Sequence, residues 1–206
     1  MTAWSSGYRD FVSSLLDQPV RGCLDQLAAR TPTPGGGGAA ALTGAMAAGL
    51  VAMAARFSAR QLPEAADLAS RADELRRRAA DLADLDAQAY TAVLEALRLP
   101  REAGQRREAL EDAALVPLEI AEIGARVGQL AVRVAEAGNP NLRGDAVTGA
   151  VLAAASARGA ACLVDINVDL GGLERELSRR AAQAVADATD AAGRATMSTE
   201  RAGKEH

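Results

Sequence analysis

Asp86 is the residue of this sequence whose surroundings most clearly suggest chemistry. A carboxylate that is buried without a partner costs several kcal/mol, and burial raises its pKa toward the range that suits general acid–base catalysis near neutral pH. Asp86 is the only charged member of an apolar row with helical spacing, which comprises Ala65, Leu68, Ala72, Leu75, Ala79, Leu82, Asp86, Ala89, Val93 and Ala96. A buried ion pair with an arginine is the structural alternative. Asp84 lies off this row, and we expect it in solvent.

Asp145 holds a similar place in a second row of helical spacing. That row comprises Leu142, Asp145, Gly149, Leu152, Ser156, Gly159 and Leu163. Because Asp145 lies one turn from the predicted start of its helix, its charge could instead stabilise the positive end of the helix dipole. We take Asp86 and Asp145 as candidate catalytic residues, and for Asp145 both interpretations stay open.

A proline- and glycine-rich segment, Arg30-Thr31-Pro32-Thr33-Pro34-Gly35-Gly36-Gly37-Gly38, precedes an alanine-rich stretch. Glycine permits close approach of a ligand to the backbone, and the first N–H groups of a helix are free to meet carbonyl or carboxylate oxygens. We therefore predict substrate binding at Pro34, Gly35, Gly36 and Gly37, and expect a side chain at Gly36 to block it. The alternative is a plain linker. A phosphate-binding loop is excluded because no Gly-Lys-Ser/Thr follows.

Asn139 and Asn141 flank Pro140 at a predicted turn between two helices. Asparagine is common in turns and at helix N-caps, which is the structural interpretation. The functional interpretation is a pair of rigidly held amides that face a polar ligand, and it makes both residues candidate substrate-binding positions.

The composition excludes several classes of function. The only histidine is His206, so histidine-based catalysis and histidine-based metal sites are not expected. Aromatic residues make up 2% of the chain and the net charge is −4, which argues against a nucleic-acid partner. We predict no metal and no cofactor.

The N-terminal residues 1–10 have neither a basic nor an apolar signal-peptide region, and Cys23 and Cys162 predict two separate buried thiols in a reducing compartment. The expected location is therefore cytoplasmic. Residues 31–55 carry no charge, but after the loop they are too short and too rich in alanine and glycine to suggest a membrane span. We predict a buried helix there, with no membrane partner.

The predicted secondary structure is helical throughout, because no segment alternates with a period of two. Helices are expected over about residues 8–16, 20–29, 39–57, 63–97, 103–137, 142–166 and 173–196, followed by a polar tail from about residue 198. This predicts an all-α fold: one domain over residues 1–206, an antiparallel bundle of about six to seven helices around the buried Ala/Gly-rich helix. That helix carries a row of bulky residues, Leu42, Met46, Leu50, Met53 and Phe57.

The order of several motifs resembles the cyclodeaminase/cyclohydrolase family of folate enzymes over nearly the whole chain. This family includes the cyclodeaminase domain of formiminotransferase-cyclodeaminase and stand-alone methenyltetrahydrofolate cyclohydrolases. The motifs are Leu15-Leu16-Asp17, Val20-Arg21, the Arg30–Gly37 loop, Asp84-Leu85-Asp86-Ala87-Gln88-Ala89-Tyr90, Leu94–Pro100, Val116-Pro117-Leu118, Asn139-Pro140-Asn141, Gly144-Asp145-Ala146 and Val164–Val168.

The resemblance implies an all-helical homodimer that binds a tetrahydrofolate derivative near the subunit interface, with Asp86 catalytic. It implies either a formiminotetrahydrofolate cyclodeaminase or a methenyltetrahydrofolate cyclohydrolase. Many members of the family carry a Gly-Lys pair where this chain has Phe57-Ser58-Ala59-Arg60-Gln61. A guanidinium stays protonated and cannot donate a proton as an amine does. The alternative is therefore a non-catalytic helical protein that binds folate without turnover.

Overall fold

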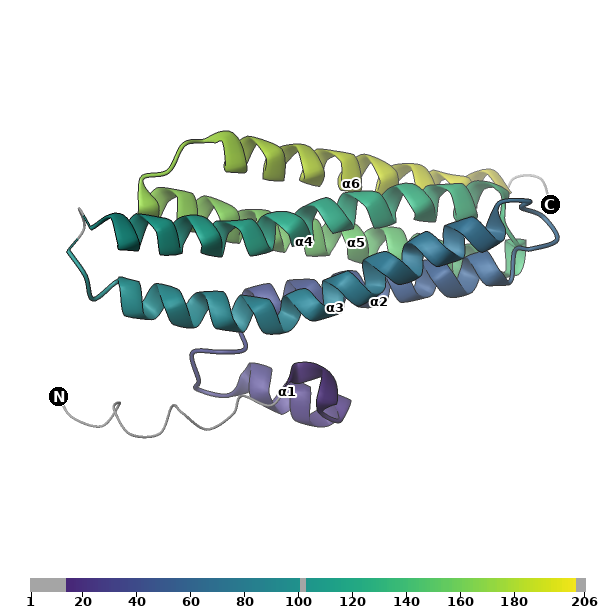
Figure 1. The fold of residues 1–206 in the computed structure, drawn as a ribbon. Helices are drawn as coiled ribbons and strands as arrows, with labels where there is room; N and C mark the ends of the chain where they lie inside the picture. Colours follow the sequence, from purple (N-terminus) through teal and green to yellow (C-terminus); the bar gives the residue numbers. More distant parts are fainter. Residues whose placement is uncertain (1–13, 101–102, 203–206) are drawn as a thin grey trace.

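The computed structural model describes residues 14–100 and 103–202, and this part of the chain contains helices and no strand (Figure 1). The all-α expectation is confirmed. The elements are η1 (Leu15–Asp17), α1 (Val20–Ala28), α2 (Gly36–Arg56), α3 (Ala65–Ala96), α4 (Gly104–Ala137), η2 (Pro140–Leu142), α5 (Arg143–Gly171) and α6 (Glu176–Ala202).

Helices α2 to α6 lie side by side in an elongated bundle, and α1 lies beside the bundle rather than within it (Figure 1). Helix α4 packs against α2, α3, α5 and α6, so it has the most neighbours among the described helices. Helices α2 and α5 run antiparallel, because Gly36 lies beside Leu163 at one end and Gly149 lies beside Val51 at the other.

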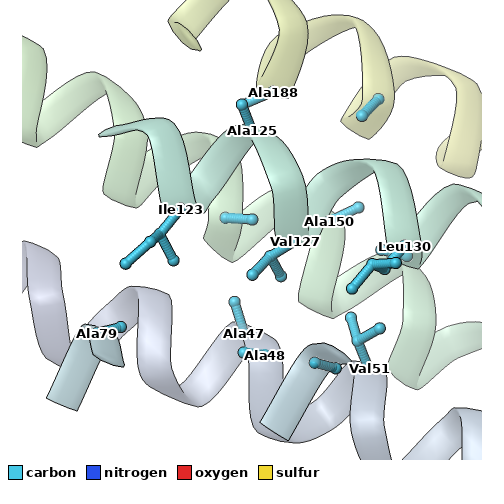
Figure 2. Close-up of a cluster of buried hydrophobic side chains, with 14 of the residues drawn as sticks. Ala47, Ala48, Val51, Ala79, Ile123, Ala125, Val127, Leu130, Ala150 and Ala188 are labelled. Atoms are coloured by element: carbon cyan, nitrogen blue, oxygen red, sulfur yellow. The ribbon is translucent and has the colours of Figure 1, made fainter. Parts of the chain in front are cut away.

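Small side chains allow helices α2, α4 and α5 to approach one another closely. Figure 2 shows Val127 and Leu130 of α4 directed toward Ala47 and Val51 of α2. One close approach lies between α4 and α5, where a Cβ on Gly124 would lie 2.7 Å from a backbone carbonyl oxygen of α5. The small residues therefore determine how tightly the bundle packs.

The bulky row of α2 does not point into the core, in contrast to the expectation of a helix buried all round. Met46 is 59% exposed and Phe57 is 63% exposed, while Leu42, Leu50 and Met53 are half-buried. The physical reason is that α2 turns its alanines and glycines toward α3, α4 and α5, where only small residues fit. Its large side chains are left on the outer face.

Most predicted helix bounds are close to the observed ones. Gly172 ends α5 in the left-handed conformation, with φ 56°, as expected of a Gly-Gly break. Helix α4 runs through the buried Pro117 as one element. Helices α5 and α6 extend past their predicted ends, so the tail expected from residue 198 is helical as far as Ala202. The helix predicted over residues 8–16 falls mostly outside the described residues.

The expectation of two buried thiols is wrong. Both cysteines are free; Cys23 is half-buried and Cys162 is exposed. Cys162 shares its face of α5 with the exposed Arg158 and Ile166, so this face points to solvent rather than to the core.

Two helical segments, Gly36–Arg56 and Pro140–Gly171, are long and apolar enough to cross a membrane by length and composition. Both belong to the bundle and pack against each other. A helix that is apolar on most sides is also what the core of a bundle requires, so packing between helices accounts for their composition.

Candidate active site at the start of α2

The Asp86 side chain reaches from α3 to the first turn of α2. The backbone N–H of Gly38 donates a hydrogen bond to Asp86 Oδ2, with 3.1 Å between nitrogen and oxygen. The first N–H groups of a helix have no partner within the helix, and the carboxylate satisfies one of them while facing the positive end of the helix dipole. Asp86 thus caps α2 from a neighbouring helix.

Gly37 makes this contact possible. A Cβ built on Gly37 would lie 1.9 Å from Asp86 Oδ1 and 2.2 Å from its Cγ. The carboxylate therefore occupies the space that any other side chain would fill at that position. Both Gly37 and Gly38 are buried, so a larger side chain at either position could not point into solvent instead.

Burial raises the pKa of Asp86, because desolvation disfavours its charged form, and the hydrogen bond from Gly38 only partly opposes this effect. Within the described residues Asp86 makes no ion pair. The alternative of a buried ion pair with an arginine therefore finds no support there. A half-buried carboxyl with a raised pKa is suited to exchange protons with a ligand.

The other loop residues surround this contact in different ways. Gly35 is the N-cap of α2 in an extended conformation, and Pro34 lies against Gly38. Gly36 is exposed, and a Cβ there would lie no closer than 3.9 Å, to Leu163. The fold would therefore accommodate a Cβ at Gly36, whereas one at Gly37 would overlap Asp86. That a side chain at Gly36 blocks the ligand stays a prediction.

Asp84 is not free in solvent, in contrast to the expectation from its place off the apolar row. It is half-buried, and its Oδ1 accepts a hydrogen bond of 3.0 Å from the backbone N–H of Leu15 in η1. The two aspartates leave α3 on different faces, Asp86 toward α2 and Asp84 toward η1. The sequence does contain a pattern that indicates this contact. Asp84 lies on a second row of helical spacing on α3, with Ala80, Ala87 and Thr91, whose small side chains allow another segment to pack there.

Asn139 and Asn141 lie at the opposite end of α2 from Asp86. Asn139 Nδ2 donates to the carbonyl of Phe57, and its N–H donates to the buried Ser58 Oγ. Asn139 Oδ1 accepts from the N–H of Asn141. These bonds tie the turn before α5 to the turn after α2, which is the structural interpretation of Asn139; the side chain of Asn141 is exposed.

Asp145 also lies at that far end. It is half-buried in the first turn of α5, the place that favours a negative charge at the helix dipole. Leu163, which contacts Gly36, lies on the same row of α5, and at 1.5 Å of rise per residue it is about 27 Å from Asp145. One chain therefore brings Asp86 and the glycine loop together but holds Asp145, Asn139 and Asn141 apart from them.

No group of three or more His, Cys, Asp or Glu side chains in the described part of the chain is placed to hold a metal ion. The polar neighbour of the Asp86 carboxyl at the start of α2 is instead a backbone amide, the N–H of Gly38.

Comparisons with known proteins agree on one family. The family model described as formiminotransferase-cyclodeaminase matches residues 19–191. The chain is 36% identical to a methenyltetrahydrofolate cyclohydrolase of Methylorubrum extorquens over 165 residues, which cover 73% of this chain and 79% of that protein. It is 31% identical to the formimidoyltransferase-cyclodeaminase of Mus musculus over 140 residues, 61% of this chain but only 26% of that protein.

The fold is also similar to a solved structure. The crystal structure of formiminotetrahydrofolate cyclodeaminase from Thermotoga maritima superposes with a TM-score of 0.83 at 26% identity, covering 90% of this chain and 98% of that one. The helical bundle is thus common to both chains over almost their entire length.

Gly37→Ala is expected to return the pKa of Asp86 toward the ordinary value of an aspartate. The added Cβ would displace the carboxylate from its buried position beside Gly38, and contact with water lowers the pKa that burial had raised. The measurement is an NMR titration of the Asp86 carboxyl carbon. Gly36→Ala is the matched control, since its Cβ meets only Leu163. An unchanged pKa in Gly37→Ala would show that Gly37 does not position the carboxylate.

Proposed function

Because the chain belongs to the formiminotransferase-cyclodeaminase family, we propose that it is a one-carbon folate enzyme that acts on the bridge between N5 and N10 of a tetrahydrofolate derivative. The observation that supports this most is the state of the Asp86 carboxyl. Burial raises its pKa, so it holds a proton more readily, and the N–H of Gly38 at the start of α2 holds it in place. Its role is that of the proton carrier.

Two reactions fit a single proton carrier. In the cyclohydrolase reaction, water adds to the methenyl carbon and Asp86 accepts one proton from it. That proton passes to N5 as the bond from carbon to N5 breaks, and the remaining hydroxyl proton leaves to solvent as the formyl C=O forms. The product is 10-formyltetrahydrofolate. In the cyclodeaminase reaction, N10 attacks the carbon of the protonated formimino group, and Asp86 carries the proton of N10 to the departing nitrogen. The bond from carbon to that nitrogen then breaks, ammonia leaves and the methenyl bridge remains. Neither sequence of steps requires a metal or a redox cofactor.

The substrate would meet the glycine loop at the same place. The N–H groups of Gly36 and Gly37 donate to no acceptor within the described residues, and such groups at a helix start bind carbonyl or carboxylate oxygens. Gly36 is exposed, so this surface is open to a ligand. Assays with 5,10-methenyltetrahydrofolate and with 5-formiminotetrahydrofolate, side by side, identify which of the two substrates is used.

The distance between the two groups of candidate residues supports a site built from two chains. Asp86 contacts the Gly38 end of α2 and Asn139 contacts the Phe57 end, and at 1.5 Å of rise per residue these ends are about 30 Å apart. In a dimer with its twofold axis through the middle of α2, the Phe57 end of one chain lies beside the Gly38 end of the other. Asp145, Asn139 and Asn141 of one chain would then complete the site around Asp86 of its partner.

The outer face of α2 supplies the surface for this dimer. Its bulky row runs from Leu42 to Phe57, and Met46, which lies near the middle of the helix, is 59% exposed. On α1, Val20 is 78% and Leu24 is 60% exposed. A twofold interface uses the same patch on both chains, and an apolar patch of this extent on a surface usually marks an interface.

The alternative is a folate-binding protein without turnover. The observation that favours it is the exposed Arg60 on the turn after α2, which stands where many family members carry a lysine and which cannot act as a proton donor. Binding of tetrahydrofolate without conversion of either substrate would support this alternative.

Asp86→Asn is expected to lower turnover by about 10²–10⁴-fold, the usual effect of removing a general acid–base, while the fold is kept. The amide still accepts the hydrogen bond from Gly38. Burial raises the pKa of Asp86 because it disfavours the charged form. At a pH above that pKa, the buried charge therefore lowers the stability of the folded wild type. The variant should therefore melt at the same or a higher temperature at neutral pH, and the difference should close as the pH falls through the pKa. Wild-type turnover in this variant would remove Asp86 from the mechanism.

Mixing two inactive variants should restore activity if the site is shared between chains. We expect Asp86→Asn and Asp145→Asn to be impaired singly and dimeric by light scattering. After mixing in equal amounts and allowing the subunits to exchange, half of the dimers contain one chain of each kind, and each of these has one intact site. Activity should therefore reach about a quarter of the wild-type value. Monomers in light scattering, or no gain on mixing, would contradict the shared site.

A further inference from the structure

A cavity of about 150 Å³ lies between α3, η1, α1 and the loop that leads to α2. Its polar lining includes Asp84 and Gln88 of α3 and Gln26 of α1, and its apolar walls include Leu15 and Pro34. A cavity of this volume accepts about one six-membered ring. It is too small for a whole folate, which needs a pocket of the usual size for a large ligand.

Asp84 lines this cavity and has one carboxylate oxygen without a hydrogen bond in the described part of the fold. Its Oδ1 accepts the hydrogen bond from Leu15 N–H, and within the described residues no donor reaches Oδ2. The side chains of Gln26 and Gln88 can each donate or accept beside it. A carboxylate flanked by amides fits a ring edge that offers two neighbouring N–H donors and one carbonyl acceptor.

The cavity and Asp86 both adjoin the first turn of α2. A Cβ on Gly38 would lie 3.5 Å from Leu15 Cδ1 and 3.7 Å from Pro34 Cβ, two residues of the cavity wall. The N–H of that same Gly38 binds Asp86. A ring held in the cavity would therefore lie next to the Gly38 segment that binds the proposed proton carrier.

We propose that the Asp84 cavity binds the 2-amino-4-oxopyrimidine ring of the pterin, with Asp84 accepting from the 2-amino group and from N3–H. This inference rests on the proposed folate substrate. It makes Asp84 a specificity-determining residue, distinct in role from Asp86: one recognises the ring, and the other moves the proton. The amide of Gln26 or Gln88 is placed to donate to the 4-oxo group.

The test compares two ligands that differ only at the recognised position. 6,7-Dimethylpterin carries the 2-amino group, and 6,7-dimethyllumazine carries an oxygen there, which repels a carboxylate. Titration of the wild-type protein to millimolar ligand should show about ten- to hundredfold preference for the pterin, the range for a hydrogen bond to a charged group. Asp84→Asn should reduce the preference to about one.

Asp84→Asn is chosen because its amide oxygen can still accept from Leu15 N–H, so the attachment of η1 is kept. Asp81→Asn is the matched control, since Asp81 is an exposed carboxylate one turn earlier on α3, and it should leave the preference unchanged. If Asp84 is only structural, Asp84→Asn should weaken the binding of both ligands equally, and that result would overturn the inference. Failure of the wild type to bind the pterin would overturn it as well.

Turnover of the wild type separates this inference from the proposed function. If the wild type converts a folate substrate but Asp84→Asn keeps the pterin preference, the ring-binding inference fails and the proposed function stands. If neither folate substrate is converted but the preference depends on Asp84, the inference stands and the proposed reaction fails.

Discussion

The contact between the Asp86 carboxylate and the first turn of α2 is the constraint on which the site depends. It places an ionisable group where water is scarce and one backbone N–H holds it. This contact also requires that residue 37 be glycine, because a Cβ on Gly37 would overlap the carboxylate. An aspartate on an apolar row and a run of glycines, separate features of the sequence, are thus two halves of one arrangement. Its cost in stability is the desolvation of the charge, which is typical of functional sites.

The small residues that bring α2 close to its neighbours have a second consequence. They leave the large side chains of α2 on its outer face, where Met46 and Phe57 are exposed and the others are half-buried. In the proposed dimer the same helix therefore positions Asp86 at one end and presents an apolar surface along its length. Assembly and chemistry would then depend on a single element, which explains why the candidate residues fall at both of its ends.

The sequence predicted the fold well because helical spacing and Pro/Gly positions are local signals. It also placed Asp86 on an inward row of α3. It could not show which helix end that row would meet, so the close contact of Asp86 with Gly37 was not predicted, and Asp84 was expected in solvent. It grouped Asp145 with Asp86 by similarity of pattern, although long-range packing separates them. Periodicity gives the face of a helix, whereas the identity of its neighbours depends on contacts between distant segments.

A crystal structure of the protein with a 5,10-bridged tetrahydrofolate analogue tests most directly whether Asp86 is the proton carrier. If Asp86 carries the proton, the bridging carbon or its attached nitrogen lies within hydrogen-bonding distance of the Asp86 carboxyl, directly or through one water molecule, beside the N–H groups that begin α2. An analogue bound elsewhere, with Asp86 still capping Gly38 and no ligand atom near it, would contradict the account and leave Asp86 with a purely structural role.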